Sequence, residues 1–311
     1  MPKRKRAAAE KLKDKEINDE EGNNVLGGMR DPTGDTRSAG SAAKDTDQIT
    51  HFKIPFSEKQ IICQRHRNLN SKAKTKDNNR PSLVFTHGAG GGIENPATKD
   101  FVTGFASAAN DDAICFQGTM NLSNRTKTFY AVLEDQGRAR ALGGRSMGSR
   151  AAVVAATECK EDMRPEAVVL VSYPLTSEKG GKTRKNGGED PRKQILLDLP
   201  EAVDVLFVSG SADNMCDLAD LREVRGRMKA RSWVMEVKSA DHGMSLKPKA
   251  AVQGVRLRSG AVAAEWLETR DQNTTYCSLE WNADDEEIYF SGWQKEGVGS
   301  EAKKAKKARK R

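Results

Sequence analysis

The chain has 311 residues, 36% of them hydrophobic and 31% charged, so it is long enough to bury one sizeable core. Its net charge of +8 comes from the ends: residues 1–16 carry seven Lys/Arg against three acids, and residues 301–311 carry seven against one. That surplus of +10 leaves residues 17–300 near −2, which argues against a broad basic face that would bind nucleic-acid phosphates.

The order of apolar and polar segments predicts one α/β domain. Residues 1–48 are basic at first and then rich in Gly, Asp, Asn, Ser and Thr without periodicity, which predicts a disordered segment and linker. From residue 49, short apolar runs alternate with amphipathic stretches. The predicted strands are 60–66, 83–86, 113–117, 141–144, 168–172, 205–209 and 234–237. The predicted helices are 97–109, 125–140, 147–158, 218–229 and 249–270. This alternation predicts a mostly parallel sheet with helices on both faces over residues 49–270.

The polar stretch at residues 176–185, TSEKGGKTRK, lies between two predicted strands. It is short, rich in glycine and almost without apolar residues, which is typical of a mobile loop rather than a helical cap. We therefore expect a minimal lid and a shallow, exposed site.

The segment that follows the last predicted helix mixes acidic and aromatic residues, and a basic tail then ends the sequence. Its aromatic residues include Trp281, Tyr289, Phe290 and Trp293. Aromatic residues of this kind often anchor a recognition segment, so residues 271–299 are one candidate for docking a partner protein. The alternative is that they pack back onto the domain as an extra hairpin.

The stretch Gly144-Arg145-Ser146-Met147-Gly148 fits the pattern G-x-S-x-G, in which a serine on a tight strand-to-helix turn exposes its hydroxyl. Gly144 and Gly148 let the strand and the helix pass close together. A predicted apolar strand precedes the motif and a helix of small residues follows it, as the motif requires. The alternative is that Ser146 only caps the helix.

A serine hydroxyl needs a base to become a nucleophile, and imidazole is the usual base. Of the four histidines only His242 follows the last predicted strand, so the chain order serine, acid, histidine selects it. The alternative is a surface loop histidine. The acid is expected after the strand between them, which selects Asp213 as acceptor of the imidazole Nδ1 proton. Asp217 and Asp241 compete, but the first is well placed to cap a helix and the second adjoins the histidine.

The sequence HGAGGG at residues 87–92 follows a predicted strand and fits the loop that supplies one donor of an oxyanion hole. The predicted donors are the N–H groups of Ala89 and Met147, and Gly88 and Gly90 allow the backbone to approach closely. No G-K-[ST] follows, and the G-x-G-x-x-G spacing is missing, so neither a phosphate loop nor a dinucleotide site is indicated.

Two charged or titratable side chains flank these motifs. His87 is expected to order its loop by hydrogen bonding and not to act as the general base. Arg145 adjoins the predicted nucleophile and either favours an anionic substrate or pairs with a neighbouring carboxylate.

The motifs HGAGGG, GGRSMGSRAA, VSYPL, VLFVSGSAD and ADHGM, in this order, resemble one α/β-hydrolase-like family. It includes the testis-expressed protein 30 and the third regulatory subunit of the nonspecific lethal acetyltransferase complex. The resemblance covers about residues 50–270. It implies the dienelactone-hydrolase-like branch of the α/β-hydrolase fold and a triad of Ser146, Asp213 and His242. It implies no substrate, and because one member belongs to a chromatin complex it leaves a non-catalytic role open.

These features predict a serine hydrolase that cleaves a small or medium carboxylic ester and requires no metal or organic cofactor. The alternative is a non-catalytic hydrolase-like scaffold in a nuclear complex, with residues 271–299 docking a protein partner. Direct nucleic-acid binding is expected only weakly, through the tails.

Composition also bears on location. The basic runs at residues 2–6 and 303–311 fit nuclear import signals, so a nuclear location is expected and a cytoplasmic one otherwise. The alternative is that they are solubilising or generic nucleic-acid-binding tails. Five scattered cysteines without a C-x-x-C pair favour a reducing compartment over a disulfide framework or a zinc site. No run of 18 apolar residues occurs, so no membrane association is expected.

Overall fold

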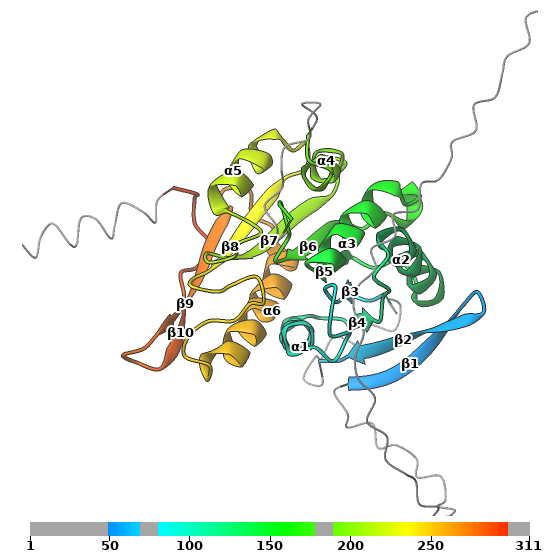
Figure 1. Ribbon diagram of the computed structural model, residues 1–311, viewed down its shortest axis with the longest axis horizontal. Coiled ribbons are helices and arrows are strands. Elements are labelled where there is room, and N and C mark those ends of the chain that lie inside the picture. The colour runs from blue at the N-terminus through cyan, green and yellow to red at the C-terminus, as the bar shows by residue number, and fades with distance from the viewer. Residues whose placement is uncertain (1–48, 69–79, 178–188, 298–311) are drawn as a thin grey trace, which may run out of the picture. The chain divides into compact units, whose positions relative to one another are not determined.

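The computed structural model describes residues 49–68, 80–177 and 189–297 (Figure 1). The predicted N-terminal segment and linker (1–48), most of the predicted loop at 176–185 and the basic C-terminal tail lie outside these ranges. Within them, one sheet has the strand order β1-β2-β4-β3-β5-β6-β7-β8-β9-β10.

The strands are β1 (Ile49–Phe56), β2 (Lys59–His66), β3 (Leu83–Thr86), β4 (Ala113–Phe116), β5 (Ala141–Arg145), β6 (Ala167–Val171), β7 (Asp204–Gly210), β8 (Ser232–Val237), β9 (Tyr276–Asn282) and β10 (Glu287–Phe290). The helices are α1 (Pro96–Ala108), α2 (Leu122–Gln136), α3 (Met147–Glu158), α4 (Pro191–Leu197), α5 (Leu218–Arg227) and α6 (Ala251–Thr269), with a 3₁₀ turn at Glu161–Met163.

All neighbours from β4 through β9 pair in parallel, and antiparallel strands flank them at both edges. The central strands are continuous apolar runs, such as AVVLV in β6, because both of their faces are covered. The predicted fold class, a mostly parallel sheet with helices on both faces, is therefore confirmed.

The two faces of the sheet bury separate apolar cores. Helices α1 and α6 cover one face, and α2, α3, α4 and α5 cover the other. Successive strand residues point to opposite faces, so Phe85 of β3 packs against α1 while its neighbour Val84 lies in the other core. All five cysteines are buried and unpaired. No helix of the described ranges has both the length and the apolar character needed to cross a bilayer.

The acidic-aromatic segment continues the sheet past residue 270, where the predicted domain ends. Strand β9 pairs in parallel with β8, and β10 forms a hairpin with β9. Trp281, Phe290 and Trp293 are partly buried and pack against the core that α1 and α6 cover, whereas Tyr289 is 62% exposed. Of the two alternatives for this segment, the structure shows the extra hairpin, because alternate residues of β9 complete a core face.

Two further elements have no counterpart among the predictions. Strand β1 contains Pro55, which is compatible with a strand only where no partner needs its N–H, and β1 is an edge strand. Helix α4 is a single short element that begins at Pro191, with Asp190 accepting a hydrogen bond from the Arg192 N–H as its cap.

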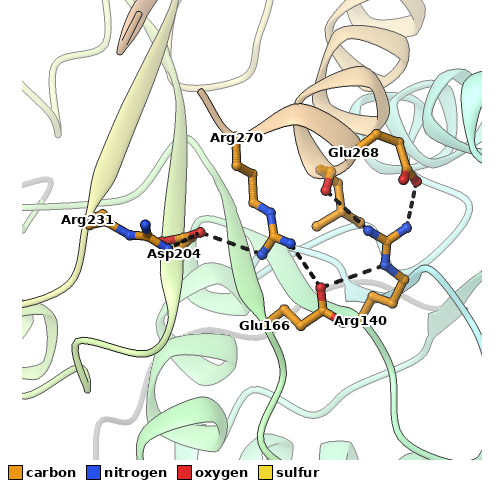
Figure 2. A network of polar contacts seen from close by, with 7 residues as sticks. Arg140, Glu166, Asp204, Arg231, Glu268 and Arg270 are labelled. Carbon is orange, nitrogen blue, oxygen red and sulfur yellow. Dashed lines mark hydrogen bonds and ion pairs between the residues drawn. The ribbon is translucent and has the colours of Figure 1, made fainter. Parts of the chain in front are cut away.

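At the amino-terminal ends of β5 to β8 an ion-pair chain ties the strands to the end of α6 (Figure 2). Its members, in order, are Arg231, Asp204, Arg270, Glu166, Arg140 and Glu268. Arg231 holds Asp204 with two hydrogen bonds of 2.7 and 3.0 Å, and Arg270 approaches the same carboxylate to 3.5 Å. The Asp204 side chain is only 2% exposed, so this carboxylate depends on its arginine partners for stabilisation.

Replacing Arg231 by methionine should lower the free energy of unfolding by about 1.5–3 kcal/mol at pH 7, because the buried Asp204 loses its two-point partner. The control is Glu268→Ala at the other end of the chain, where a 38% exposed carboxylate should contribute less than about 1 kcal/mol. Urea unfolding measures both. Equal losses of unfolding free energy would show that the ion pair of the buried Asp204 contributes no more to stability than that of the exposed Glu268.

Candidate active site

The carboxyl ends of parallel strands meet at one edge of a sheet, and this edge carries the predicted site residues. Ser146 follows β5, Asp213 lies in the loop after β7, and His242 lies in the loop after β8. The loop that begins with His87 follows β3, which pairs with β5. Four segments that are far apart in the sequence thus meet around Ser146.

The structure joins the three predicted side chains in one hydrogen-bonded chain. The Ser146 Oγ lies 2.9 Å from His242 Nε2, and His242 Nδ1 lies 3.0 and 2.9 Å from the two carboxylate oxygens of Asp213. The Asp213 side chain is fully buried, and that of His242 is 20% exposed. In the neutral imidazole with its proton on Nδ1, the ring donates to Asp213 and accepts the Ser146 hydroxyl proton.

Ser146 occupies a strained turn between β5 and α3. Its φ and ψ are 51° and −113°, in a region that L-residues rarely adopt. The turn is compact enough that a Cβ on Gly144 would lie 2.2 Å from the Gly148 carbonyl carbon, and one on Gly148 would lie 2.5 Å from the His87 oxygen. Ser146 makes no side-chain capping bond to α3, so its hydroxyl is directed to His242 instead.

The competing acids have other partners. Asp217 caps α5 by accepting hydrogen bonds from the Ala219 and Asp220 N–H groups. Asp241 accepts the Ser245 N–H at 2.9 Å, and the imidazole Nδ1 is paired with Asp213 instead. Asp213 alone of the three reaches His242, as its position after β7 predicts.

The predicted oxyanion donors lie on two sides of Ser146. Met147 is the first residue of α3, so its N–H has no carbonyl partner within the helix. Gly88 is buried against the turn, since a Cβ placed on it would lie 3.6 Å from the Ser146 Cβ, and Ala89 follows it as an exposed residue. Gly90 is exposed and an added Cβ would meet no protein atom within 4 Å, so packing within the fold does not require a glycine there.

His87 is placed to order the loop after β3. The Gly118 N–H donates to its Nε2 at 3.0 Å, so its proton sits on Nδ1, which donates to the Gly88 carbonyl at 2.7 Å. Burial lowers the pKa of His87 to about 4, with the nearby Arg125 cation acting in the same direction. Its ring is therefore neutral and structural at pH 7.

Two arginines that the sequence reasoning missed hold the loops of the site. Arg125 of α2 is fully buried and donates to the carbonyl oxygens of His87, Gly88 and Thr119. Arg256 of α6 donates to the Gly243 and Met244 carbonyls at 3.0 Å. An arginine on an amphipathic helix normally faces solvent, so no sequence pattern pointed to either residue.

Arg145, which the sequence already singled out, also holds a loop of the site. Its Nη2 donates to the His242 carbonyl oxygen at 2.9 Å. Of the two roles that the sequence leaves open for Arg145, the ion pair with a neighbouring carboxylate is not formed within the described residues.

Comparison with known proteins agrees with this architecture. Residues 118–264 match the family described as Alpha/beta hydrolase domain. The esterase Est1E from Butyrivibrio proteoclasticus is similar in structure, with a TM-score of 0.51 and 12% identity over 70% of this chain and 99% of that one. An esterase from Pyrobaculum calidifontis has a TM-score of 0.51 and 16% identity over 74% of this chain and 87% of that one. The chain has the α/β-hydrolase fold. The narrower resemblance to the family of testis-expressed protein 30 stays a prediction.

Adding a methyl group at Gly144 should disrupt the turn that carries Ser146. The new Cβ would overlap the Gly148 backbone, so Gly144→Ala should lower the free energy of unfolding by about 1–3 kcal/mol or more. Gly90→Ala is the matched control and should leave stability unchanged, since its Cβ enters open space. Thermal unfolding compares the two variants. Equal melting temperatures would contradict the close approach of β5 and α3 at Gly144.

The buried neutral histidines should make stability fall in mild acid. His66 and His87 each have a pKa lowered to about 4 in the folded state against about 6.5 when unfolded, mainly by burial. The unfolded chain therefore binds more protons between these values, so stability is lost as the pH falls from about 6.5 towards 4. Denaturant unfolding at several pH values measures how steeply the free energy of unfolding falls with falling pH. This dependence should be weaker for His87→Asn than for the wild type. An unchanged dependence would contradict the assignment of His87 as a neutral side chain at pH 7.

Proposed function

We propose that this chain, which has the α/β-hydrolase fold, is a serine hydrolase that cleaves small or medium carboxylic esters. The observation that carries the proposal is the unbroken hydrogen-bonded chain from Ser146 through His242 to Asp213. This geometry is what nucleophilic acyl transfer needs. The serine hydroxyl is hydrogen-bonded to a base, and the base is hydrogen-bonded to a buried carboxylate that fixes its tautomer.

In the first half-reaction, Ser146 Oγ attacks the ester carbonyl carbon while His242 Nε2 accepts the hydroxyl proton. The imidazolium that forms is stabilised by Asp213, whose carboxylate also accepts the Met215 N–H at 2.8 Å. As the carbon–oxygen bond to the alcohol breaks, the imidazolium returns the proton to the leaving alkoxide. An acyl group is then bound to Ser146 through an ester bond.

In the second half-reaction, water replaces the alcohol. His242 accepts a proton from the attacking water, and the acyl carbon passes through a second tetrahedral intermediate. The bond to Ser146 Oγ breaks and the proton returns to that oxygen, which releases the carboxylic acid and restores the hydroxyl. No cofactor is needed in either half-reaction.

The negative oxygen of each intermediate is assigned to the N–H groups of Met147 and Ala89. Support comes from the position of the loop after β3, because Gly88 lies against Ser146 and Ala89 is the next residue. The His87 and Gly88 carbonyl groups of this loop accept hydrogen bonds from Arg125, and His87 Nδ1 also lies 2.7 Å from the Gly88 carbonyl oxygen. Donors held in place before the reaction stabilise a developing charge without reorganisation.

The scaffold alternative has less support. A docking role for residues 271–299 was expected to use four aromatic residues, of which Trp281, Phe290 and Trp293 pack against the domain's own core. Tyr289 is the remaining exposed ring. A nuclear location and binding through the basic tails stay predictions that depend on residues outside the described ranges.

Steady-state kinetics on short-chain esters test the proposal. Ser146→Ala and His242→Ala should each lower kcat by about a million-fold, and Asp213→Asn by about ten-thousand-fold because it inverts the histidine tautomer. Asp217→Asn is the matched control, since that carboxylate caps α5 and should leave kcat unchanged.

Full activity of the Ser146→Ala protein would exclude the proposed nucleophile. Equal losses in the Asp213→Asn and Asp217→Asn proteins would exclude the assignment of the acid.

A further inference from the structure

Arg145 has a cationic group that the fold uses only in part. Its Nη2 donates to the His242 carbonyl oxygen, which is its one hydrogen bond among the described residues. The Nε is buried and has no hydrogen-bond partner. An arginine offers five donors, so most of this guanidinium's capacity is unused.

The acids near Arg145 bind elsewhere. Asp213 is held by His242, and Asp241 accepts the Ser245 N–H. No carboxylate of the described residues comes within 4 Å of Arg145. Burial, the largest cause, and the neighbouring Arg256 lower the pKa of Arg145, while Asp213 and Asp241 act in the opposite direction.

The unpaired side of this guanidinium lies beside the nucleophile. A Cβ placed on Gly88 would be 2.8 Å from Arg145 Nη1 and 3.6 Å from the Ser146 Cβ. Nη1 therefore lies where the loop after β3 meets the Ser146 turn. Both Arg145 and Ser146 are partly exposed.

We propose that Arg145 binds a carboxylate on the acyl part of the substrate, so that the preferred substrates are half-esters of short dicarboxylic acids. The inference rests on the proposed function and names the substrate class of that site. A guanidinium without a carboxylate partner gains charge-assisted hydrogen bonds when an anionic acyl chain enters, and a neutral chain offers none. Burial strengthens the preference because water screens the pair less.

A positioning role alone would give a different result. Arg145 and Arg256 both bind the His242 loop, but Arg256 donates to Gly243, Met244 and Ser245 and has Asp100 as a counter-charge. Loss of a residue that only positions this loop should slow neutral and anionic esters equally. Loss of a residue that binds the substrate carboxylate should slow anionic esters selectively.

The test compares monomethyl succinate with methyl 4-methylpentanoate, in which an isopropyl group of similar shape replaces the carboxylate. Acid release in a pH-stat gives kcat/KM for each. The wild type should favour monomethyl succinate by about 10- to 100-fold, and the preference should shrink as salt is added. Arg145→Met should abolish the preference and Arg145→Lys should keep part of it. Arg256→Met should lower both values and leave their ratio unchanged.

Equal kcat/KM values for the two esters in the wild type, or an unchanged ratio in Arg145→Met, would overturn the inference. Ser146-dependent hydrolysis of the neutral ester would still uphold the proposed function. If neither ester is hydrolysed, the proposed function fails, and the inference is tested by the binding of succinate alone. Calorimetry should then show succinate binding to the Ser146→Ala protein and none to the Ser146→Ala, Arg145→Met double variant. Absence of binding to both, or equal binding, would overturn it.

Discussion

The site depends on one close crossing, where β5 ends and α3 begins. Gly144 and Gly148 bring the strand and the helix so near that no side chain fits between them, and Ser146 takes a positive φ as a result. That conformation withdraws the hydroxyl from helix capping and directs it to His242. The free-energy cost of the strained backbone is offset by the packing of α3 and β5 in the core, which holds the Ser146 turn in this conformation from both ends.

Arginines fix the loops around this turn. Arg125, Arg145 and Arg256 come from α2, β5 and α6, and each donates to backbone carbonyls in the loop after β3 or in the His242 loop. Such bonds orient the peptide groups of loops that have no ladder partners of their own. They also gather positive charge around a site where negative charge develops during acyl transfer, so the same side chains serve structure and electrostatics.

The order of the motifs made much of this site predictable. Ser146, Asp213 and His242 each follow a strand, and parallel strands bring such positions to one edge, so the three could be selected without coordinates. The buried arginines could not, because their roles arise from loops that fold over them. The β9–β10 hairpin could be named only as one of two alternatives, although Cys277, Leu279 and Trp281 alternate towards one core, because the acidic residues between them obscured the period-2 pattern.

Labelling with a fluorophosphonate probe measures most directly whether Ser146 is an activated nucleophile, since the probe needs no knowledge of the substrate. The wild-type protein should gain one adduct, located on Ser146 by peptide mass spectrometry, and His242→Ala should remain unlabelled while keeping its folded circular dichroism spectrum. A folded wild-type protein without the adduct, or an adduct on another residue, would contradict the assembled Ser146, His242 and Asp213 site as the origin of activity.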